Sequence, residues 1–175
     1  GLYENTNIIF AGDNGLAVGQ HGLMGKQNVY EHSVGVPLMI KAAAQHTGKK
    51  TADLCYLIDV FPTLCDMLQL PVPQSVDGIS LLSSLDGKEP VRDYLYYSYM
   101  DNQRGISDGT WKLIEYHVNG KRTTQLFNLK NDPWERNDLS GQKKYEKTIQ
   151  RLREKMAEEQ KRTNDTSVFW NNFSY

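Results

Sequence analysis

The chain has 175 residues, of which 39% are hydrophobic and 23% are charged, so it is long and apolar enough to fold around a core as one domain, or as one domain with a small annex. Its 20 Lys and Arg side chains balance 21 Asp and Glu side chains, and a net charge of −1 gives no electrostatic argument for nucleic acid as a partner. No apolar run approaches the roughly 18 residues that cross a bilayer, and two cysteines are too few for a disulfide framework. We therefore expect neither nucleic acid nor a membrane among its partners.

The chain begins with Gly1 and enters a strand-like run of β-branched and apolar residues at 7–11. Residues 12–15, which are Gly, Asp, Asn and Gly, close this run, so we expect a buried strand that ends in a loop. A strand so close to a first residue that is not Met favours a piece cut from a longer protein.

Residues 12–33 are polar and contain five glycines, at positions 12, 15, 19, 22 and 25. Two interpretations stay open. The stretch is either a surface loop whose glycines supply positive-φ turns, or an ordered loop at the end of a strand, where α/β folds hold their sites. Residues 36–42 then predict a second buried strand, with Pro37 at its start, where no ladder donor is needed.

The remaining chain predicts helices and antiparallel strands. Apolar residues at helical spacing favour a helix over about 60–69, with Asp59 as N-cap and Pro62 in the first turn, followed by a loop to about Pro90. Three antiparallel strands are expected around the turn Asn119-Gly120, and a terminal amphipathic helix after them. The strands are expected at 94–99, 111–116 and 124–129, and the helix at 143–162.

Several side chains in the glycine-rich stretch could carry chemistry. Asp13 and Asn14 offer two hard oxygens suited to Ca²⁺ or Mg²⁺, although the same residues are common in a plain Asx turn. His21 could be a base, a ligand or a surface side chain, and Lys26 could contact an anion or be solvated. Their gathering in one loop after a predicted strand is a stronger signal than any one of them.

The order of motifs along the chain resembles the C-terminal half of the type I sulfatases, the formylglycine-dependent family with an alkaline-phosphatase-like α/β fold. The glycine-rich stretch carries the first motifs of this resemblance, and the last, Leu-Phe-Asn-Leu followed by Asn-Asp-Pro-Trp-Glu, resembles the closing signature of the family. The matching runs lie at 13–15, 19–22, 25–27, 30–33, 36–38, 58–64, 77–81, 108–114 and 126–135.

This resemblance implies roles for four residues. Asp13 and Asn14 would complete a Ca²⁺ site, and Lys26 would contact the sulfate. His21 would lie close to the active site as a catalytic residue. A divalent cation and a fixed ammonium would offset the negative charge that develops on the sulfate oxygens in the transition state.

The chain also departs from the family pattern. The nucleophile of these sulfatases is a Cys or Ser matured to formylglycine in a Cys/Ser-x-Pro-x-Arg motif, and neither Cys55 nor Cys65 nor any Ser stands in such a motif. The acidic pair that supplies the other Ca²⁺ ligands is missing, and Gly35 stands where many relatives carry Arg. We therefore expect the chain alone to be inactive and to bind Ca²⁺ weakly or not at all.

Together these observations predict the C-terminal part of a sulfatase catalytic α/β domain over 1–88 and an α+β subdomain with an antiparallel sheet and terminal helix over 89–175. The full-length protein would hydrolyse sulfate esters, with sulfated small molecules or glycans as substrates. A related phosphoesterase or phosphonate hydrolase, or a non-catalytic module, stays as an alternative. The family resemblance implies a periplasmic, secreted or lysosome-like compartment.

Two further expectations concern surfaces. Without the missing N-terminal half of the domain, strands 7–11 and 36–42 would expose apolar edges, and the fragment would tend to self-associate. Arg104, which follows Tyr97 and Tyr99, would bind a second anionic group of the substrate, because this region of sulfatases lies beside the mouth of the active site. The alternative is that Arg104 pairs with a nearby aspartate.

Overall fold

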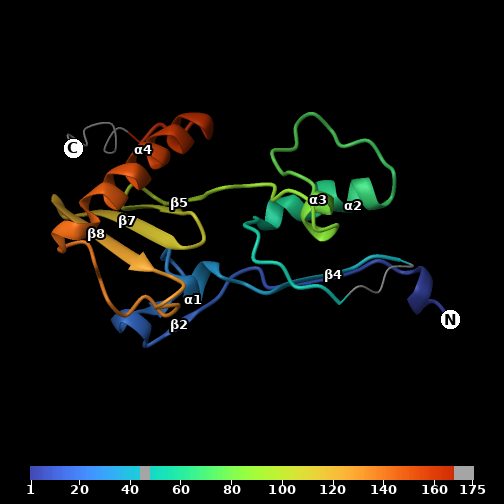
Figure 1. The fold of residues 1–175 in the computed structure, drawn as a ribbon, viewed down its shortest axis with the longest axis horizontal. Coiled ribbons are helices and arrows are strands. Elements are labelled where there is room, and N and C mark those ends of the chain that lie inside the picture. Colours follow the sequence, from blue (N-terminus) through green and yellow to red (C-terminus); the bar gives the residue numbers. More distant parts are fainter. Residues whose placement is uncertain (44–47, 168–175) are drawn as a thin grey trace. The chain divides into compact units, whose positions relative to one another are not determined.

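The computed structural model describes residues 1–43 and 48–167, and the chain forms two compact units (Figure 1). The first comprises residues Gly1–Gly15 and Val36–Asp93, and the second comprises Leu16–Gly35 and Tyr94–Tyr175. The predicted domain division at residue 88 stays a prediction. The compact units differ from it because the segment 16–35 packs with the C-terminal half of the chain.

Within the described residues, the first unit contains a two-stranded antiparallel ribbon and four short helical segments. After the 3₁₀ turn η1 (Tyr3–Asn5), strand β1 (Ile8–Ala11) pairs with β4 (Leu38–Lys41), with Ile9 opposite Ile40. The helical part comprises η3 (Leu57–Asp59), α2 (Val60–Met67) and α3 (Leu82–Leu85).

The ribbon corrects one prediction, because its strands are not buried. Phe10 is 56% exposed and Met39 is 60% exposed. The apolar composition located both strands correctly, but burial also requires a second layer. A ribbon of two strands, as described here, does not supply that layer to both of its faces.

Helix α2 matches the predicted 60–69, with Pro62 in its first turn. Asp59 occupies the N-cap position as predicted, but its side chain makes no capping hydrogen bond to α2. The fully buried Asp59 carboxylate instead accepts the backbone N–H groups of Tyr56 and Ile79, each at 2.8 Å, and pairs with the Arg92 guanidinium. The Asp59 carboxylate thereby joins three separate segments of this unit. The loop expected up to Pro90 also contains the short helix α3, whose Leu and Ser composition gave little helical signal.

Two runs that carry the family resemblance pack on each other here. A Cβ atom added to Gly78 would lie 2.2 Å from the Ile58 carbonyl oxygen, so only glycine allows this approach. The Thr63 hydroxyl donates to the Asp59 carbonyl oxygen at 2.6 Å and accepts the Leu81 N–H at 2.9 Å. The runs 58–64 and 77–81 are therefore one structural feature.

The second unit is built on a four-stranded antiparallel meander in the order β5-β6-β7-β8. One strand more than predicted is present, since residues 103–107 form a strand of their own. The turn at Asn119 and Gly120 is confirmed: both have left-handed φ angles, of 51° and 75°, as a tight hairpin requires. The strands are β5 (Leu95–Tyr99), β6 (Gln103–Ser107), β7 (Trp111–Val118) and β8 (Lys121–Asn128).

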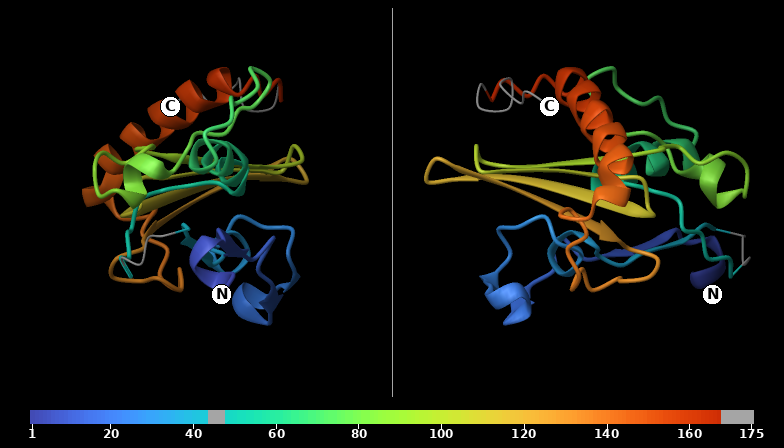
Figure 2. Two further views of the ribbon diagram at one scale, coloured as in Figure 1. Left: turned by 90° about the vertical axis from the view of Figure 1, so that its right-hand side faces the viewer. Right: turned by 60° about the vertical axis from the view of Figure 1, so that its left-hand side comes forward.

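Different elements cover the two faces of this sheet (Figures 1 and 2). On one face lies the terminal helix, η4 (Lys143–Tyr145) continued by α4 (Glu146–Arg162), as the sequence predicts. Its apolar stripe packs on alternate residues of the central strands. This core contains Ile106, Leu113, Leu126, Ile149, Leu152 and Met156.

The opposite face is covered by the glycine-rich segment. This segment contains β2 (Ala17–Val18), η2 (Gln20–Gly22), β3 (Met24–Gly25) and α1 (Glu31–Val34). Val29 and Tyr30 pack here on Ile114 and Phe127, which form a second core. Among residues 1–43 and 48–167, no helix combines the length and apolar character that a bilayer crossing requires.

Candidate functional site

Asp13 and Asn14 follow the end of strand β1 after Gly12, as predicted, and both are exposed. The Asn14 amide nitrogen donates to the Gly15 carbonyl oxygen at 2.8 Å, and no hydrogen bond within the described residues occupies the Asn14 amide oxygen. A carboxylate and an amide oxygen at a strand end are hard ligands that fit Ca²⁺. They are a small part of the 6–8 oxygens that Ca²⁺ takes, and the described residues hold no cluster of three or more His, Cys, Asp or Glu side chains around a metal-sized space.

His21 and Lys26 lie on one hairpin of the second unit. Strands β2 and β3 pair Ala17 with Gly25, so the turn at 19–23 forms the tip and Lys26 follows the base. Lys26 is exposed, and no ion pair with it occurs in the part of the chain that the structure describes. The ammonium is therefore available to an anion.

His21 is held in an uncommon backbone conformation. Its φ of 53° is left-handed, which costs free energy for a residue with a Cβ atom. The imidazole stacks on the ring of Tyr30, with centroids 3.9 Å apart and an interplanar angle of 4°. The Tyr30 hydroxyl in turn donates to Gln125 Oε1 at 2.7 Å, so strand β8 helps to fix the position of His21.

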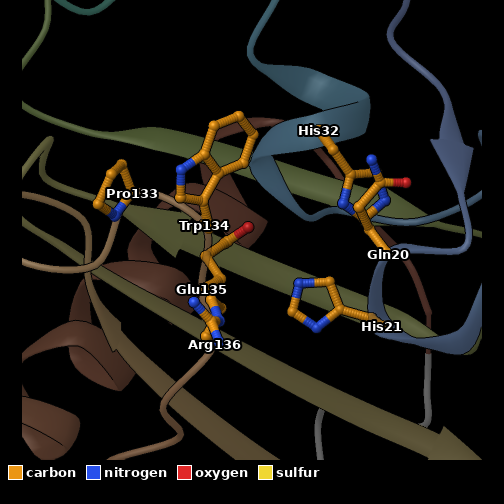
Figure 3. Close-up of a pocket in the computed structure, with 7 residues that line it drawn as sticks. All are labelled: Gln20, His21, His32, Pro133, Trp134, Glu135 and Arg136. Carbon is orange, nitrogen blue, oxygen red and sulfur yellow. The ribbon is translucent and has the colours of Figure 1, made fainter.

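A hollow of about 500 Å³ lies between the hairpin tip, α1 and the loop that carries the closing signature. Figure 3 shows the indole of Trp134 on one side of it and the imidazoles of His21 and His32 on the other. A second hollow, of about 460 Å³, also includes His21 and extends along the sheet to Gln103 and Gln125. The first is lined by Gln20, His21, His32, Pro133, Trp134, Glu135 and Arg136.

His32 has a distinct electrostatic environment. Burial, and then the neighbouring charges of His21 and Lys112, lower the pKa of its imidazole below the ordinary 6.5. Its Nε2 atom is buried and has no hydrogen-bond partner among the described residues. At neutral pH this imidazole is therefore neutral, and its contribution to the hollow is hydrogen bonding without charge.

A buried charge cluster joins the closing signature to α1. Lys112 is fully buried, and its Nζ lies 2.8 Å from Glu31 Oε1 and 3.1 Å from Glu135 Oε1. The other Glu135 oxygen accepts the Glu31 N–H at 2.6 Å. Burial raises the pKa of the Glu135 carboxyl, and the Lys112 ammonium opposes that shift.

Arg104 lies in a structural ion pair. It is 3% exposed, and its guanidinium donates to both carboxylate oxygens of Asp165, at 2.5 and 2.9 Å. Because side chains alternate along β6, Arg104 shares the α4 face with Ile106, whereas its neighbour Gln103 lines the second hollow on the other face. This environment favours the alternative, a structural role, although the partner is Asp165, which is distant in sequence.

Three residues that line the first hollow were not predicted from the sequence: His32, Trp134 and Arg136. The first two lie inside motifs that carry the family resemblance. The cluster of Lys112, Glu31 and Glu135 was not predicted either. The available signal was a lysine within a strand whose neighbours on both sides are apolar, since such a lysine needs a buried partner.

The chain matches one family model and is similar to curated proteins and to solved structures. Residues 19–162 match the model of the family described as N-sulphoglucosamine sulphohydrolase, C-terminal. An N-acetylglucosamine-6-O-sulfatase from Bacteroides thetaiotaomicron is 30% identical over 178 residues, which cover 94% of this chain and 32% of that protein. The chain thus spans about a third of the length of the curated relatives it matches.

Solved structures show the same fold. One, determined in complex with its substrate D-glucosamine-2-N,6-O-disulfate, superposes with a TM-score of 0.77 at 28% identity and covers 95% of this chain and 36% of that one. A phosphonate monoester hydrolase from Agrobacterium radiobacter superposes with a TM-score of 0.72 at 24% identity, covering 90% of this chain and 35% of that one. That second likeness is one of fold alone.

Proposed function

Because the chain belongs to the N-sulphoglucosamine sulphohydrolase C-terminal family, we propose that it is the C-terminal part of a sulfatase that hydrolyses sulfate esters of sugars. The observation that carries the proposal is that the family match spans the hairpin with His21 and Lys26 together with the closing signature. Support for a sugar as substrate comes from the relatives, one of which is named for N-acetylglucosamine 6-O-sulfate and another of which holds a glucosamine disulfate.

The proposed mechanism gives this chain the task of stabilising charge. Sulfate ester cleavage builds negative charge on the sulfate and leaving-group oxygens. Lys26, exposed at the base of its hairpin, would contact a sulfate oxygen, and His21 would donate or accept a proton near the leaving group. Asp13 and Asn14 would hold part of a Ca²⁺ site, and the bound ion would supply Lewis-acid stabilisation of the sulfate.

The nucleophile has no counterpart in this chain. Burial raises the pKa of the Cys55 thiol, so Cys55 is not an activated thiolate, and Cys65 is buried. The two-stranded ribbon with its exposed Phe10 and Met39 offers an apolar surface for the rest of a catalytic domain or, in isolation, for a second copy. The chain alone would be inactive, and the compartment of the protein, periplasmic, secreted or lysosome-like, stays a prediction.

The experiment compares Lys26→Ala with the wild type in the full-length protein. We expect kcat for an aryl sulfate to fall by about 100- to 1000-fold, because a fixed cation opposite developing charge is lost. Lys143→Ala, which removes an exposed lysine of η4, is the matched control and should leave kcat unchanged.

The same preparation is assayed with an aryl phosphate and an aryl phosphonate monoester. A wild type that prefers either of these to the aryl sulfate would overturn the sulfatase proposal in favour of the phosphoesterase or phosphonate hydrolase alternative. An unchanged kcat in Lys26→Ala would remove Lys26 from the proposed site.

A further inference from the structure

The hollow beside His21 contains groups that sulfate cleavage does not require. Trp134 is 68% exposed, which is unusual for the largest aromatic side chain. Arg136 is exposed as well, and no ion pair with it occurs within residues 1–43 and 48–167. Both side chains line the same space.

The loop that carries these two side chains is anchored between them. Glu135 is 2% exposed and is held by Lys112 and by the Glu31 N–H. Its φ of 54° is left-handed, and its own N–H donates to the Asp132 carbonyl oxygen at 3.1 Å. Glu135 is buried, whereas its two neighbours, Trp134 and Arg136, are exposed and line the hollow with it (Figure 3).

The position of the buried Glu135 side chain also affects the charge of the hollow. The Glu135 carboxylate lies 3.1 Å from the buried Lys112 ammonium, which Glu31 shares, and no ion pair between Glu135 and Arg136 occurs within the described residues. The neutral imidazole of His32 and the amide of Gln20 add hydrogen-bonding groups without negative charge. The hollow therefore combines one aromatic face, one planar cation and several neutral polar groups.

We propose that this hollow binds a pyranose ring that carries a sulfate or carboxylate group, with the ring against Trp134 and the anionic group on Arg136. An indole face packs well on the apolar C–H face of a sugar, and a guanidinium matches the oxygens of a sulfate or carboxylate in bidentate geometry. The imidazole of His32 and the Gln20 amide would bind ring hydroxyls. The inference rests on the proposed function, and it adds which residues of this chain recognise the sugar.

The test uses four variants of the full-length protein: Trp134→Ala, Trp134→Phe, Arg136→Ala and Arg136→Lys. With glucosamine-2-N,6-O-disulfate as substrate, we expect KM to rise about 3- to 10-fold in Trp134→Ala, from loss of stacking. It should rise about 10- to 100-fold in Arg136→Ala, from loss of a charge-assisted contact. With 4-nitrophenyl sulfate, which has no sugar, KM should change less than 2-fold in both. Trp134→Phe and Arg136→Lys should recover part of the sugar KM.

Equal effects on both substrates would overturn the proposal, since Trp134 and Arg136 would then be structural. Calorimetric binding of the disulfate separates this failure from a failure of the proposed function. If the wild type binds the sugar but hydrolyses neither sulfate, and Arg136→Ala loses this binding, the sugar-binding proposal stands and the sulfatase proposal is wrong. Equal binding by wild type, Trp134→Ala and Arg136→Ala would reject the hollow, whatever the turnover. An uronic acid monosaccharide that binds as well as the disulfate would identify the carboxylate as the group on Arg136.

Discussion

Replacing Lys112 by methionine is expected to lower the free energy of unfolding by about 3–5 kcal/mol, the usual cost of removing one partner from a buried ion pair. The substitution leaves the Glu135 carboxylate, which is 2% exposed, without its ammonium. Methionine fills a similar volume, so the loss reports charge and not a cavity. Urea denaturation followed by tryptophan fluorescence measures it, because Trp111 lies in the same strand, β7.

A matched control and a double variant make this result specific. Lys147→Met removes an exposed lysine of α4 and should change stability by less than about 0.5 kcal/mol. Lys112→Met with Glu135→Met should recover part of the loss, because the remaining Glu31 side chain is 32% exposed and can be hydrated. A Lys112→Met protein as stable as the wild type would show that the buried charge cluster does not stabilise the loop that carries the closing signature.

Asp59→Ala is expected to destabilise the first unit by a similar amount, about 3–5 kcal/mol. The variant leaves the Arg92 guanidinium, whose side chain is 7% exposed, without its carboxylate, and it orphans the N–H groups of Tyr56 and Ile79. Asp59→Asn should cost less, since an amide oxygen still accepts one of these hydrogen bonds. Thermal unfolding followed by circular dichroism compares both with Asp66→Ala, which removes an exposed carboxylate from α2.

An Asp59→Ala protein that melts with the Asp66→Ala control would contradict this view of the first unit. The carboxylate would then be replaceable by water, and the packing of Gly78 on Ile58 would have to hold the two motifs together without it.

The elements that were predicted well are those determined by local pattern. The helix α4 carries its own apolar stripe, and the hairpin at Asn119 and Gly120 carries residues that tolerate left-handed φ. Strand β6 was missed because Arg104 and Gly105 occupy positions where an apolar alternation would have marked it. The buried Arg104 guanidinium is satisfied by Asp165, 61 residues away, and by the carbonyl oxygens of Met100 and Gln103.

In the candidate site, too, the features that depend on local sequence were predicted and those that depend on long-range contacts were not. Asp13, Asn14, His21 and Lys26 lie within one continuous stretch, so the motif was visible in the sequence alone. The groups that lie near His21 in the second unit come together through long-range contacts, such as the one between Lys112 and Glu31, 81 residues apart. No spacing rule along the chain reveals such contacts, because the sheet register and the covering segment bring these residues together.

The most direct measurement of the central claim is sulfate release by the full-length protein, with its Ca²⁺ content measured in the same preparation. We expect the wild type to contain Ca²⁺ and to release sulfate from glucosamine-2-N,6-O-disulfate. Asp13→Ala should lose the metal and about 100-fold or more of the rate, since a bound cation contributes several kcal/mol to such reactions. Asp66→Ala, with an exposed carboxylate lost elsewhere in the same unit, should retain both. A wild type without sulfate release, or an Asp13→Ala protein with unchanged Ca²⁺ content and rate, would contradict the central claim.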